Sequence, residues 1–268
     1  RYQKQLTNEL KQKGKNMLIN QELERTLRSL RLSGMIASLP ARIQQATDGA
    51  LAPMEFFQLL LDDETTRRKD RLFDRRLKLA RLNPLKRLDN FDWSFNPKTP
   101  KKIVCELATA RFIAEHENII AIGQPGTGKS HLMNAIALCA IHAGYSSLYF
   151  QIHDLIADIM EATATGQRKS LFARLLKTDL LILDDMGFKR LKYDDAEELL
   201  EIIMRRYEHA STIMISNRPI EDWPKTLGDA ATTSALLDRL MHHAHMLSFQ
   251  GKSYRLEENA LAKNKKES

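Results

Sequence analysis

The chain has 268 residues, of which 43% are hydrophobic and 28% charged, fractions typical of a globular protein with one large core or two smaller ones. Residues 1–100 carry 20 Lys and Arg against 12 Asp and Glu, a net charge of +8, whereas residues 101–268 carry 21 against 22, so that the whole chain has a net charge of +7. No apolar run approaches the ~18 residues of a membrane span, and residues 1–16 lack the apolar core of a secretory signal, so we expect neither.

The N-terminal part is predicted to form a small all-α domain. Apolar residues recur at helical spacing in residues 17–46, a second helix follows Pro53, and a third covers residues 65–82. The apolar residues of the third helix that we expect to face the core are Leu72, Phe73, Leu77 and Leu79. A basic excess in such a domain favours a polyanionic partner.

A linker is predicted next, because residues 88–102 contain two prolines and several turn-forming residues. We therefore interpret residues 1–90 as the helical domain, 91–102 as the linker and 103–268 as a second domain.

Helices and strands alternate from residue 103 onward. A helix over 103–116 precedes the first strand, and later helices are predicted up to residue 142 and over 153–162, 168–177, 194–208 and 232–243. The predicted strands are 119–123, 146–151, 179–185, 211–216 and 245–249. Strands separated by helices indicate a parallel five-stranded sheet between helical layers, an α/β fold. Residues 250–268 are too few for a C-terminal helical lid, so none is expected.

The two cysteines, Cys105 and Cys139, show neither a disulfide framework nor metal-ligand spacing. Both lie in apolar helical patterns, so we expect buried free thiols. This usage fits a reducing compartment and predicts a cytoplasmic protein.

The sequence GQPGTGKS, residues 123–130, matches the pattern G-x-x-x-x-G-K-S between an apolar strand and a helix. Glycines let backbone N–H groups approach a triphosphate, and the helix N-terminus adds partial positive charge. Lys129 would reach the β- and γ-phosphates of ATP, and the Ser130 hydroxyl would bind Mg²⁺. The predicted cofactor-binding residues are Gly123, Gln124, Pro125, Gly126, Thr127, Gly128, Lys129, Ser130 and His131. For His131 a local packing or hydrogen-bonding role is favoured over catalysis.

Polar residues follow two of the predicted strands. Asp184 and Asp185 end the apolar strand LLILDD, where Asp184 would hold Mg²⁺ and Asp185 would polarise the attacking water. Asn217 follows the strand STIMIS and would orient that water. The alternatives are solvated aspartates at a strand end and an ordinary turn asparagine.

Arg239, in LLDRL, would reach the nucleotide of a neighbouring subunit and stabilise charge in the transition state. The alternative is a surface salt bridge with Asp238. Arg206 is a rival for the same role. The histidines His242, His243 and His245 are favoured as structural residues over metal ligands.

The stretch 67–87 contains ten Lys and Arg and two Asp. Phosphates are the natural partner of such a surface, in contacts independent of base sequence and weakened by salt. The alternative is a solvated charged helix. The arginines predicted to contact DNA are Arg67, Arg68, Arg71, Arg75 and Arg76.

In their order and spacing, four segments resemble the IstB/DnaC-like AAA+ ATPases: GQPGTGKSHL, DLLILDDMG, STIMISNRP and LLDRL. The segments LRLSGMIASL, DRRLKLARL, FDWSF and GKSYRL make the chain more similar to IstB than to helicase loaders, so the resemblance covers nearly all of it past residue 20. It implies a P-loop core with strand order 5-1-4-3-2, and self-assembly on duplex DNA with ATP and Mg²⁺. It also implies target selection and stimulation of a partner transposase.

The resemblance further implies roles for single residues: Lys129 and Ser130 as Walker A, Asp184 and Asp185 as Walker B, Asn217 as sensor 1, and Arg239 as arginine finger. Many AAA+ proteins have Glu where this chain has Asp185, so we expect slow turnover and a switch driven mainly by ATP binding. A second-sensor arginine is not assigned.

Three other functions stay open on the sequence. A DnaC-like helicase loader would bind single strands and a helicase. A nucleotide kinase would need a lid and an acceptor pocket. A nucleotide-stabilised adaptor would need Lys129 but not Asp185. The basic N-terminal part favours duplex contact, and hence the transposition helper, assembled as a ring or an open helix.

Overall fold

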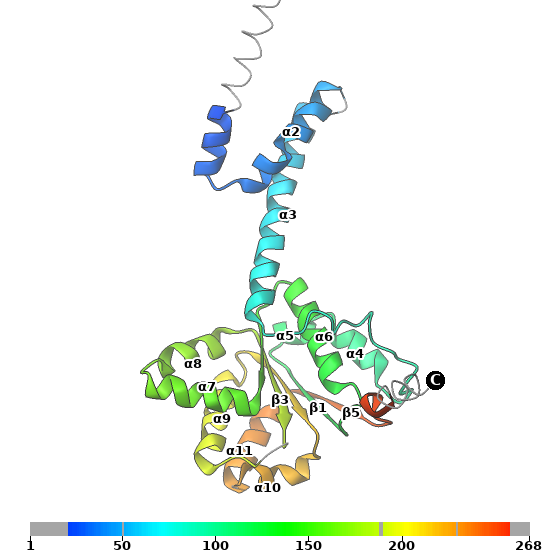
Figure 1. The fold of residues 1–268 in the computed structure, drawn as a ribbon, viewed down its shortest axis with the longest axis vertical. Coiled ribbons are helices and arrows are strands. Elements are labelled where there is room, and N and C mark those ends of the chain that lie inside the picture. Colours follow the sequence, from blue (N-terminus) through cyan, green and yellow to red (C-terminus); the bar gives the residue numbers. More distant parts are fainter. Residues whose placement is uncertain (1–20, 50, 188–189, 229, 258–268) are drawn as a thin grey trace, which may run out of the picture. The chain divides into compact units, whose positions relative to one another are not determined.

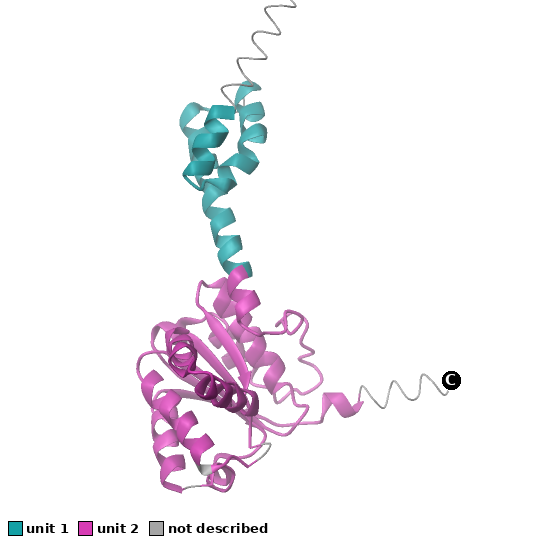
Figure 2. Ribbon diagram, turned by 60° about the vertical axis from the view of Figure 1, so that its left-hand side comes forward, with its two compact units in different colours: residues 1–74 teal, residues 75–268 magenta. Residues whose placement is uncertain are grey.

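The computed structural model describes residues 21–49, 51–187, 190–228 and 230–257. The chain divides into two compact units, residues 1–74 and 75–268 (Figure 2). None of the helices within the described ranges is long and apolar enough to cross a bilayer.

The N-terminal unit is helical where it is described, as predicted. Residues 21–29 form a helix, which is followed by α2 (Ser33–Thr47) and α3 (Pro53–Leu79), and the division between the units falls within α3 (Figure 1). The sequence predicted two helices where α3 is continuous, because no glycine or proline interrupts residues 54–79. The predictions for residues 1–20 lie outside the described residues.

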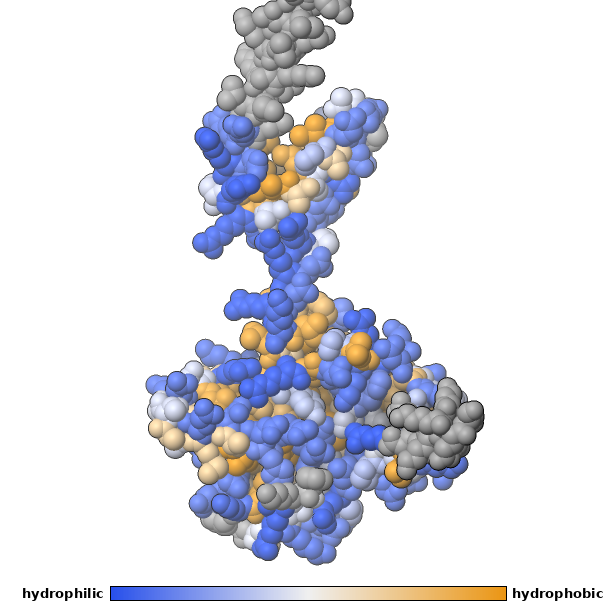
Figure 3. Space-filling model, viewed as in Figure 1, coloured by the Kyte–Doolittle hydropathy of each residue, from blue (hydrophilic) through white to orange (hydrophobic). Residues whose placement is uncertain are grey.

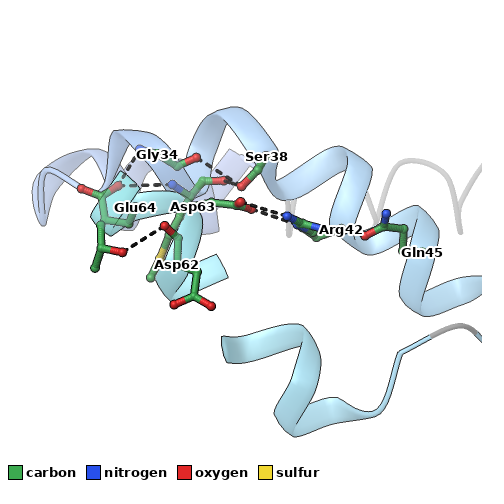
Figure 4. Close-up of polar contacts among 9 residues, drawn as sticks. Gly34, Ser38, Arg42, Gln45, Asp62, Asp63 and Glu64 are labelled. Atoms are coloured by element: carbon green, nitrogen blue, oxygen red, sulfur yellow. Dashed lines mark hydrogen bonds and ion pairs between the residues drawn. The ribbon is translucent and has the colours of Figure 1, made fainter. Parts of the chain in front are cut away.

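A buried carboxylate joins α2 to α3. Glu64 Oε2 accepts hydrogen bonds from the backbone N–H groups of Gly34 and Met35, at 2.5 and 3.2 Å (Figure 4). Arg68 Nε lies 2.6 Å from Glu64 Oε1. These N–H groups belong to the first turn of α2 and have no partner within their own helix. A Cβ at residue 34 would lie 2.6 Å from Glu64 Cα, so this crossing requires glycine.

Beside it, Arg42 donates two hydrogen bonds of 2.9 Å to the carboxylate of Asp63 (Figure 4). This bidentate pair, with a smaller contribution from Ser38, lowers the pKa of Asp63 to about 2. The apolar core of this unit is small, and Leu72 is 44% exposed, so its predicted core position is wrong. Figure 3 shows apolar residues on the surface of this unit.

The C-terminal unit contains a parallel five-stranded sheet in the order β2-β3-β4-β1-β5, which confirms the predicted order. Its strands are β1 (Asn118–Gly123), β2 (Ser147–Gln151), β3 (Leu180–Met186), β4 (Ser211–Ser216) and β5 (Ala244–Phe249). Its helices are α4 (Lys101–Leu107), α5 (Arg111–Ala114), α6 (Lys129–His142), α7 (Ile152–Ala164), α8 (Arg168–Lys177), α9 (Tyr193–Arg206), η1 (Ile220–Asp222), α10 (Trp223–Leu227) and α11 (Ala230–Met241).

Two apolar clusters cover the two faces of this sheet. Along β3, Leu180 and Ile182 belong to the cluster beneath α4 and α6, whereas Leu181 and Leu183 belong to the cluster beneath α7, α8, α9 and α11 (Figure 1). Because strand side chains alternate between faces, a strand buried on both sides is apolar throughout. This explains the continuous run LLIL.

Residues 80–93 belong to the C-terminal unit and pack on its core. The observed division between the two units therefore lies before the predicted linker. Tyr149 N–H donates a 2.8 Å hydrogen bond to Ala80 O, and the Asn134 side chain bonds the backbone of Asn83 in both directions. Phe91 and Trp93 lie against the core.

Three further predictions need correction. The helix predicted over 103–116 is two short helices, because Ala110 adopts a left-handed conformation with φ of 61°. Both cysteines are free, but Cys105 is exposed and Cys139 half-buried. Val104 and Leu107 provide the buried face of α4, which turns Cys105 outward. Leu79 is 54% exposed and not in the core.

Candidate nucleotide-binding site

A phosphate-binding loop joins the end of β1 to the start of α6. Gly126 and Gly128 adopt positive φ of 81° and 97°, a conformation that favours glycine. A Cβ on residue 128 would lie 2.6 Å from the Phe91 ring. The loop therefore has the tight turn and the helix N-terminus that cradle a phosphate.

Lys129 is buried, and its ammonium group lies over the loop. Lys129 Nζ donates hydrogen bonds of 2.6 and 2.8 Å to the carbonyls of Gly123 and Gln124, so the third N–H of the ammonium remains for a ligand. Burial lowers the pKa of Lys129 to about 8, against the opposing effect of Asp184 and Asp185. An anion in the loop would restore the charged form.

Two aspartates end β3, and they have different surroundings. Asp184 is buried, and its carboxylate accepts hydrogen bonds from the Tyr149 hydroxyl at 2.8 Å and from Asp185 N–H at 2.7 Å. Asp185 has φ of 61°, at an irregularity in the pairing of β3 with β4. This irregularity breaks the alternation of the strand, which would otherwise direct the two carboxylates to opposite faces.

Asn217 lies directly after β4, the neighbour of β3. Asn217 Nδ2 is 3.4 Å from Asp185 Oδ1. Burial and the charge of Asp184 raise the pKa of Asp185, and Asn217 acts in the opposite direction. The two side chains thus lie together at the carboxyl edge of the sheet.

A pocket of about 280 Å³ opens at this edge. Of the residues predicted from sequence, Pro125, Gly126, Thr127, Gly128, Lys129, Ser130, His131, Asp185 and Asn217 line it. Gly123 and Gln124 contribute through their carbonyls, and Asp184 lies buried behind. His131 Nε2 makes a 2.8 Å hydrogen bond with Arg87 O, the local role expected from sequence.

Sequence reasoning missed the other walls of the pocket. They are formed by Lys86, Asn90, Phe91, Asp92, Phe95, Asn96, Tyr254 and Arg255. A signal is present in the sequence, because FDWSF and GKSYRL are among the segments that resemble the family. Nothing in their spacing, however, predicts that residues about 160 positions apart meet at the P-loop.

The two candidate trans-acting arginines differ. Arg206 is buried and donates hydrogen bonds to the carbonyls of Leu175, Thr178 and Ser211, so its proposed rival role is wrong. It stabilises carbonyl groups beside the strands and does not reach outward. Arg239, on α11, is on the surface outside the pocket and pairs with Asp238 at 3.0 Å.

The donor set beside the loop fits a hard cation. Ser130 offers a hydroxyl and Asp184 a carboxylate, and Mg²⁺ prefers such oxygen ligands together with waters and phosphates. A separate cluster of exposed residues that could hold a metal ion has its ligand atoms within 4.8 Å of one another. It consists of Glu208, His242 and His243. His245 instead bonds Glu117 at 2.7 Å.

The five arginines predicted to contact DNA are not equivalent. Arg68 pairs with Glu64, and Arg71 Nη1 donates to Ser33 Oγ at 2.7 Å. Arg67 and Arg75 are exposed, and Arg76 is half-buried. Among the described residues, no hydrogen bond or ion pair joins Arg67 or Arg75 to a side chain, so these two can contact phosphates without breaking an internal contact.

The strand order, the phosphate loop after β1 and the acidic end of β3 define a P-loop nucleotide-binding protein of the AAA+ type. Solved structures with this fold include the DnaC helicase loader, with a TM-score of 0.51 and 24% identity over 62% of this chain and 97% of that one. DnaA bound to AMPPCP and single-stranded DNA has a TM-score of 0.56 and 22% identity over 69% of this chain and 56% of that one.

The family is shown by sequence. The IstB-like ATP binding protein model matches residues 25–262, and the chain belongs to this family. It is 36% identical to an ATP-binding protein of insertion sequence IS21 from Pseudomonas aeruginosa, over 90% of this chain and 91% of that one. It is 34% identical to an ATP-binding protein of insertion sequence IS5376 from Geobacillus stearothermophilus, over 88% and 94%.

Proposed function

We propose that this chain is an ATPase helper of insertion-sequence transposition, which assembles on duplex DNA in its ATP-bound form and recruits and stimulates a transposase. The observation that carries the proposal is the convergence of Lys129, Asp185 and Asn217 on one pocket at the P-loop. The insertion-sequence relatives support the transposition context.

ATP binding would use the loop and Lys129. The N–H groups of residues 126–130 and the N-terminus of α6 offer partial positive charge, and the Lys129 ammonium adds a full charge. The buried position of Lys129 makes its pairing with phosphate stronger than at an exposed site.

Mg²⁺ would be held by Ser130 and, directly or through water, by Asp184, and would supply charge neutralisation at the phosphates. Hydrolysis would use the second carboxylate. Asp185 accepts the proton of the attacking water, and the Asn217 amide orients that water, since the two side chains lie 3.4 Å apart. The short Asp side chain supports slow turnover, so ATP binding is the main switch.

DNA binding and assembly would use other surfaces. Arg67 and Arg75 are exposed cations able to contact phosphates without regard to base sequence. Arg239 lies outside the pocket of its own chain and would complete the site of a neighbouring subunit. Each subunit then senses ATP at the interface with the next one, which couples nucleotide binding to assembly.

The test measures duplex-DNA binding by sedimentation and by gel shift, in the presence of ATP–Mg²⁺, in the presence of ADP–Mg²⁺ and without nucleotide. Lys129→Ala is compared with Lys177→Ala, a control at an exposed position on α8. We expect large cooperative complexes with ATP only, lost in Lys129→Ala and kept in the control. Addition of the transposase encoded by the same element should then increase its activity on that DNA.

Absence of duplex binding in every nucleotide state would contradict the proposal. Binding to single strands and a replicative helicase would then favour the loader function. ATP-dependent assembly that survives Asp185→Ala with no measurable hydrolysis in the wild type would instead indicate a nucleotide-stabilised adaptor.

A further inference from the structure

We propose that Glu208, His242 and His243 form a binding site for a transition-metal ion, with Zn²⁺ as the ion that fits best, and that the bound ion fastens the end of α11 to the end of α9. None of the three residues lines the nucleotide pocket, so this site is separate from the proposed Mg²⁺ position at Ser130 and Asp184. The inference does not depend on the proposed ATPase function.

The ligand atoms of the three side chains already lie close to metal-binding positions. One atom from each lies within 4.8 Å of the other two, and His242 Nδ1 is 4.0 Å from Glu208 Oε1. Ligands about 2.1 Å from a tetrahedral Zn²⁺ lie about 3.4 Å apart, so each atom needs to move by no more than about 1 Å. All three side chains are exposed, which allows this movement and leaves room for water as a fourth ligand.

The two histidines are consecutive, and their rings nevertheless lie side by side. Neighbouring residues of an α-helix point about 100° apart, which would separate the two imidazoles. Helix α11 ends at Met241, however, so His242 and His243 lie in the turn that leads to β5. Their ring centroids are 4.0 Å apart. The turn therefore presents both imidazoles on one side.

A buried asparagine holds this turn on the central sheet. Asn118, the first residue of β1, donates its backbone N–H to His243 O at 2.6 Å and its side-chain Nδ2–H to Leu240 O at 3.2 Å. The two histidines are thus attached to a rigid part of the fold, which is what a preorganised metal site requires.

The third ligand comes from the turn between α9 and β4, and this turn is also held firmly. The buried Arg206 donates hydrogen bonds to the carbonyls of Thr178 and Ser211, which fixes the last residue of α9. Two residues later, Glu208 adopts a left-handed conformation with φ of 60°. Such a conformation is uncommon for a residue with a side chain, persists where the surroundings impose it, and is frequent at ligand sites.

The two turns are already joined by a weaker contact. Helices α9 and α11 pack against each other (Figure 1), and the Tyr207 hydroxyl makes a 2.6 Å hydrogen bond with His242 Nδ1. This bond keeps Nδ1 on the side of Glu208. A metal ion bound at Nδ1 would replace it at little cost, because a hydroxyl at the surface can bond to water instead.

The donor set decides which ion the site takes. Two imidazole nitrogens and one carboxylate oxygen are the ligands that Zn²⁺ accepts in tetrahedral sites, and Ni²⁺ and Cu²⁺ also bind imidazole well. Mg²⁺ requires octahedral oxygen ligands and keeps its waters, so it should not compete. The site therefore selects transition metals even where Mg²⁺ is abundant.

The experiment titrates Zn²⁺ into the untagged full chain by calorimetry, after removal of bound metal with a chelator and in excess Mg²⁺, which occupies the oxygen-lined nucleotide site. The variants are His242→Ala, His243→Ala and Glu208→Gln. His209→Ala is the matched control, because His209 is an exposed histidine next to Glu208 and outside the cluster.

We expect the wild type and His209→Ala to bind about one Zn²⁺ per chain, and each of the three variants to bind it at least about tenfold more weakly. Zn²⁺ should also raise the midpoint of thermal unfolding of the wild type and of the control, and raise it less in His242→Ala. Without metal, all variants should unfold at the midpoint of the wild type, since the substituted side chains are exposed.

Three results would overturn the inference. One is the absence of saturable Zn²⁺ binding to the wild type. Another is binding that persists unchanged in all three variants, because the ion would then be held elsewhere. The third is an equal loss of affinity in His209→Ala, which would indicate diffuse binding to surface histidines.

Discussion

The Tyr149 hydroxyl donates a 2.8 Å hydrogen bond to Asp184 Oδ2 across the pairing of β2 with β3. In the register of these strands Tyr149 lies opposite Ile182, two residues before Asp184 and on the same face. Burial, together with the charge of Asp184, raises the pKa of Tyr149, so this hydroxyl stays protonated and always donates. It therefore fixes the orientation of the carboxylate proposed to bind Mg²⁺.

Replacing Tyr149 with Phe removes this donor and leaves Asp184 with the Asp185 N–H. We expect the free energy of unfolding to fall by about 1–2 kcal/mol. The Mg²⁺ concentration for half-maximal ATP turnover should rise by roughly 10-fold, because a residue that orients a metal ligand is lost. Urea unfolding and a Mg²⁺ titration measure the two effects. Tyr145→Phe, at a partly buried tyrosine beside the same core cluster, is the control. An unchanged Mg²⁺ requirement would contradict the positioning role of Tyr149.

The contact between Tyr149 and Asp184 could not be predicted from the sequence. The motifs predicted the residues of the loop, because each motif is local and its physical demands fix its neighbours, whereas the strand order was expected from the family resemblance. Tyr149 lies in the strand SSLYFQ as one aromatic residue among others, and only the register of β2 on β3 brings it to Asp184. The meeting of Arg255 with the phosphate loop also depends on long-range packing that no spacing encodes.

Other predictions were wrong because residue type and helical spacing do not determine which side chains become buried. Arg206 is an arginine near a helix end, and its burial depends on the carbonyls that surround it in the folded chain. Cys105 and Leu72 were predicted buried from helical spacing alone. An apolar periodicity does not tell which of its residues another element covers.

The pKa of Lys129, about 8, predicts proton uptake when ATP binds. Above pH 8 the free lysine is largely neutral, and bound phosphates favour its charged form, so the complex takes up a proton. At pH 9 the phosphates of free ATP have already lost their protons, and uptake approaches one per site. Calorimetry in two buffers of different ionisation enthalpy measures it. A Lys129→Arg variant that still binds ATP should show none, because arginine stays charged.

The affinity for ATP should also depend on pH, because it depends on the charge of Lys129. The free lysine carries less charge as the pH rises through 8, so ATP binding weakens from pH 7 to pH 9. An affinity that stays constant over this range, with no proton uptake, would contradict a lowered pKa of Lys129.

Arg206 is predicted to contribute to stability and not directly to catalysis. Arg206→Met leaves the carbonyls of Leu175, Thr178 and Ser211 without their donor, and we expect a loss of about 3 kcal/mol or more in the free energy of unfolding. Arg205→Met, at the neighbouring arginine with a 52% exposed side chain, should change it by less than about 0.5 kcal/mol. Urea denaturation of both variants distinguishes the two positions, and equal stabilities would refute the structural role.

Arg239 is predicted to act in the site of a neighbouring subunit. Arg239→Ala should retain ATP affinity, because this residue lies outside its own pocket, and should lower turnover of the assembled protein by roughly 10³-fold. Lys129→Ala should lose ATP binding and still supply Arg239 to its neighbour. A mixture of the two inactive variants should therefore regain part of the ATPase activity at mixed interfaces. No recovery in mixtures that still assemble would argue against action in trans.

The exposed arginines are predicted to set the salt dependence of duplex binding. Arg67→Ala and Arg75→Ala should each weaken binding to unrelated duplexes by a similar factor. Each should also reduce the slope of log affinity against log salt by about 1, since each removes one phosphate contact. Arg68→Ala is the informative comparison, because Arg68 already pairs with Glu64 and its loss should affect stability more than the slope. Gel shifts at several salt concentrations give the slopes. If Arg68→Ala alone changed the slope, the DNA-contacting surface would lie on another face of α3.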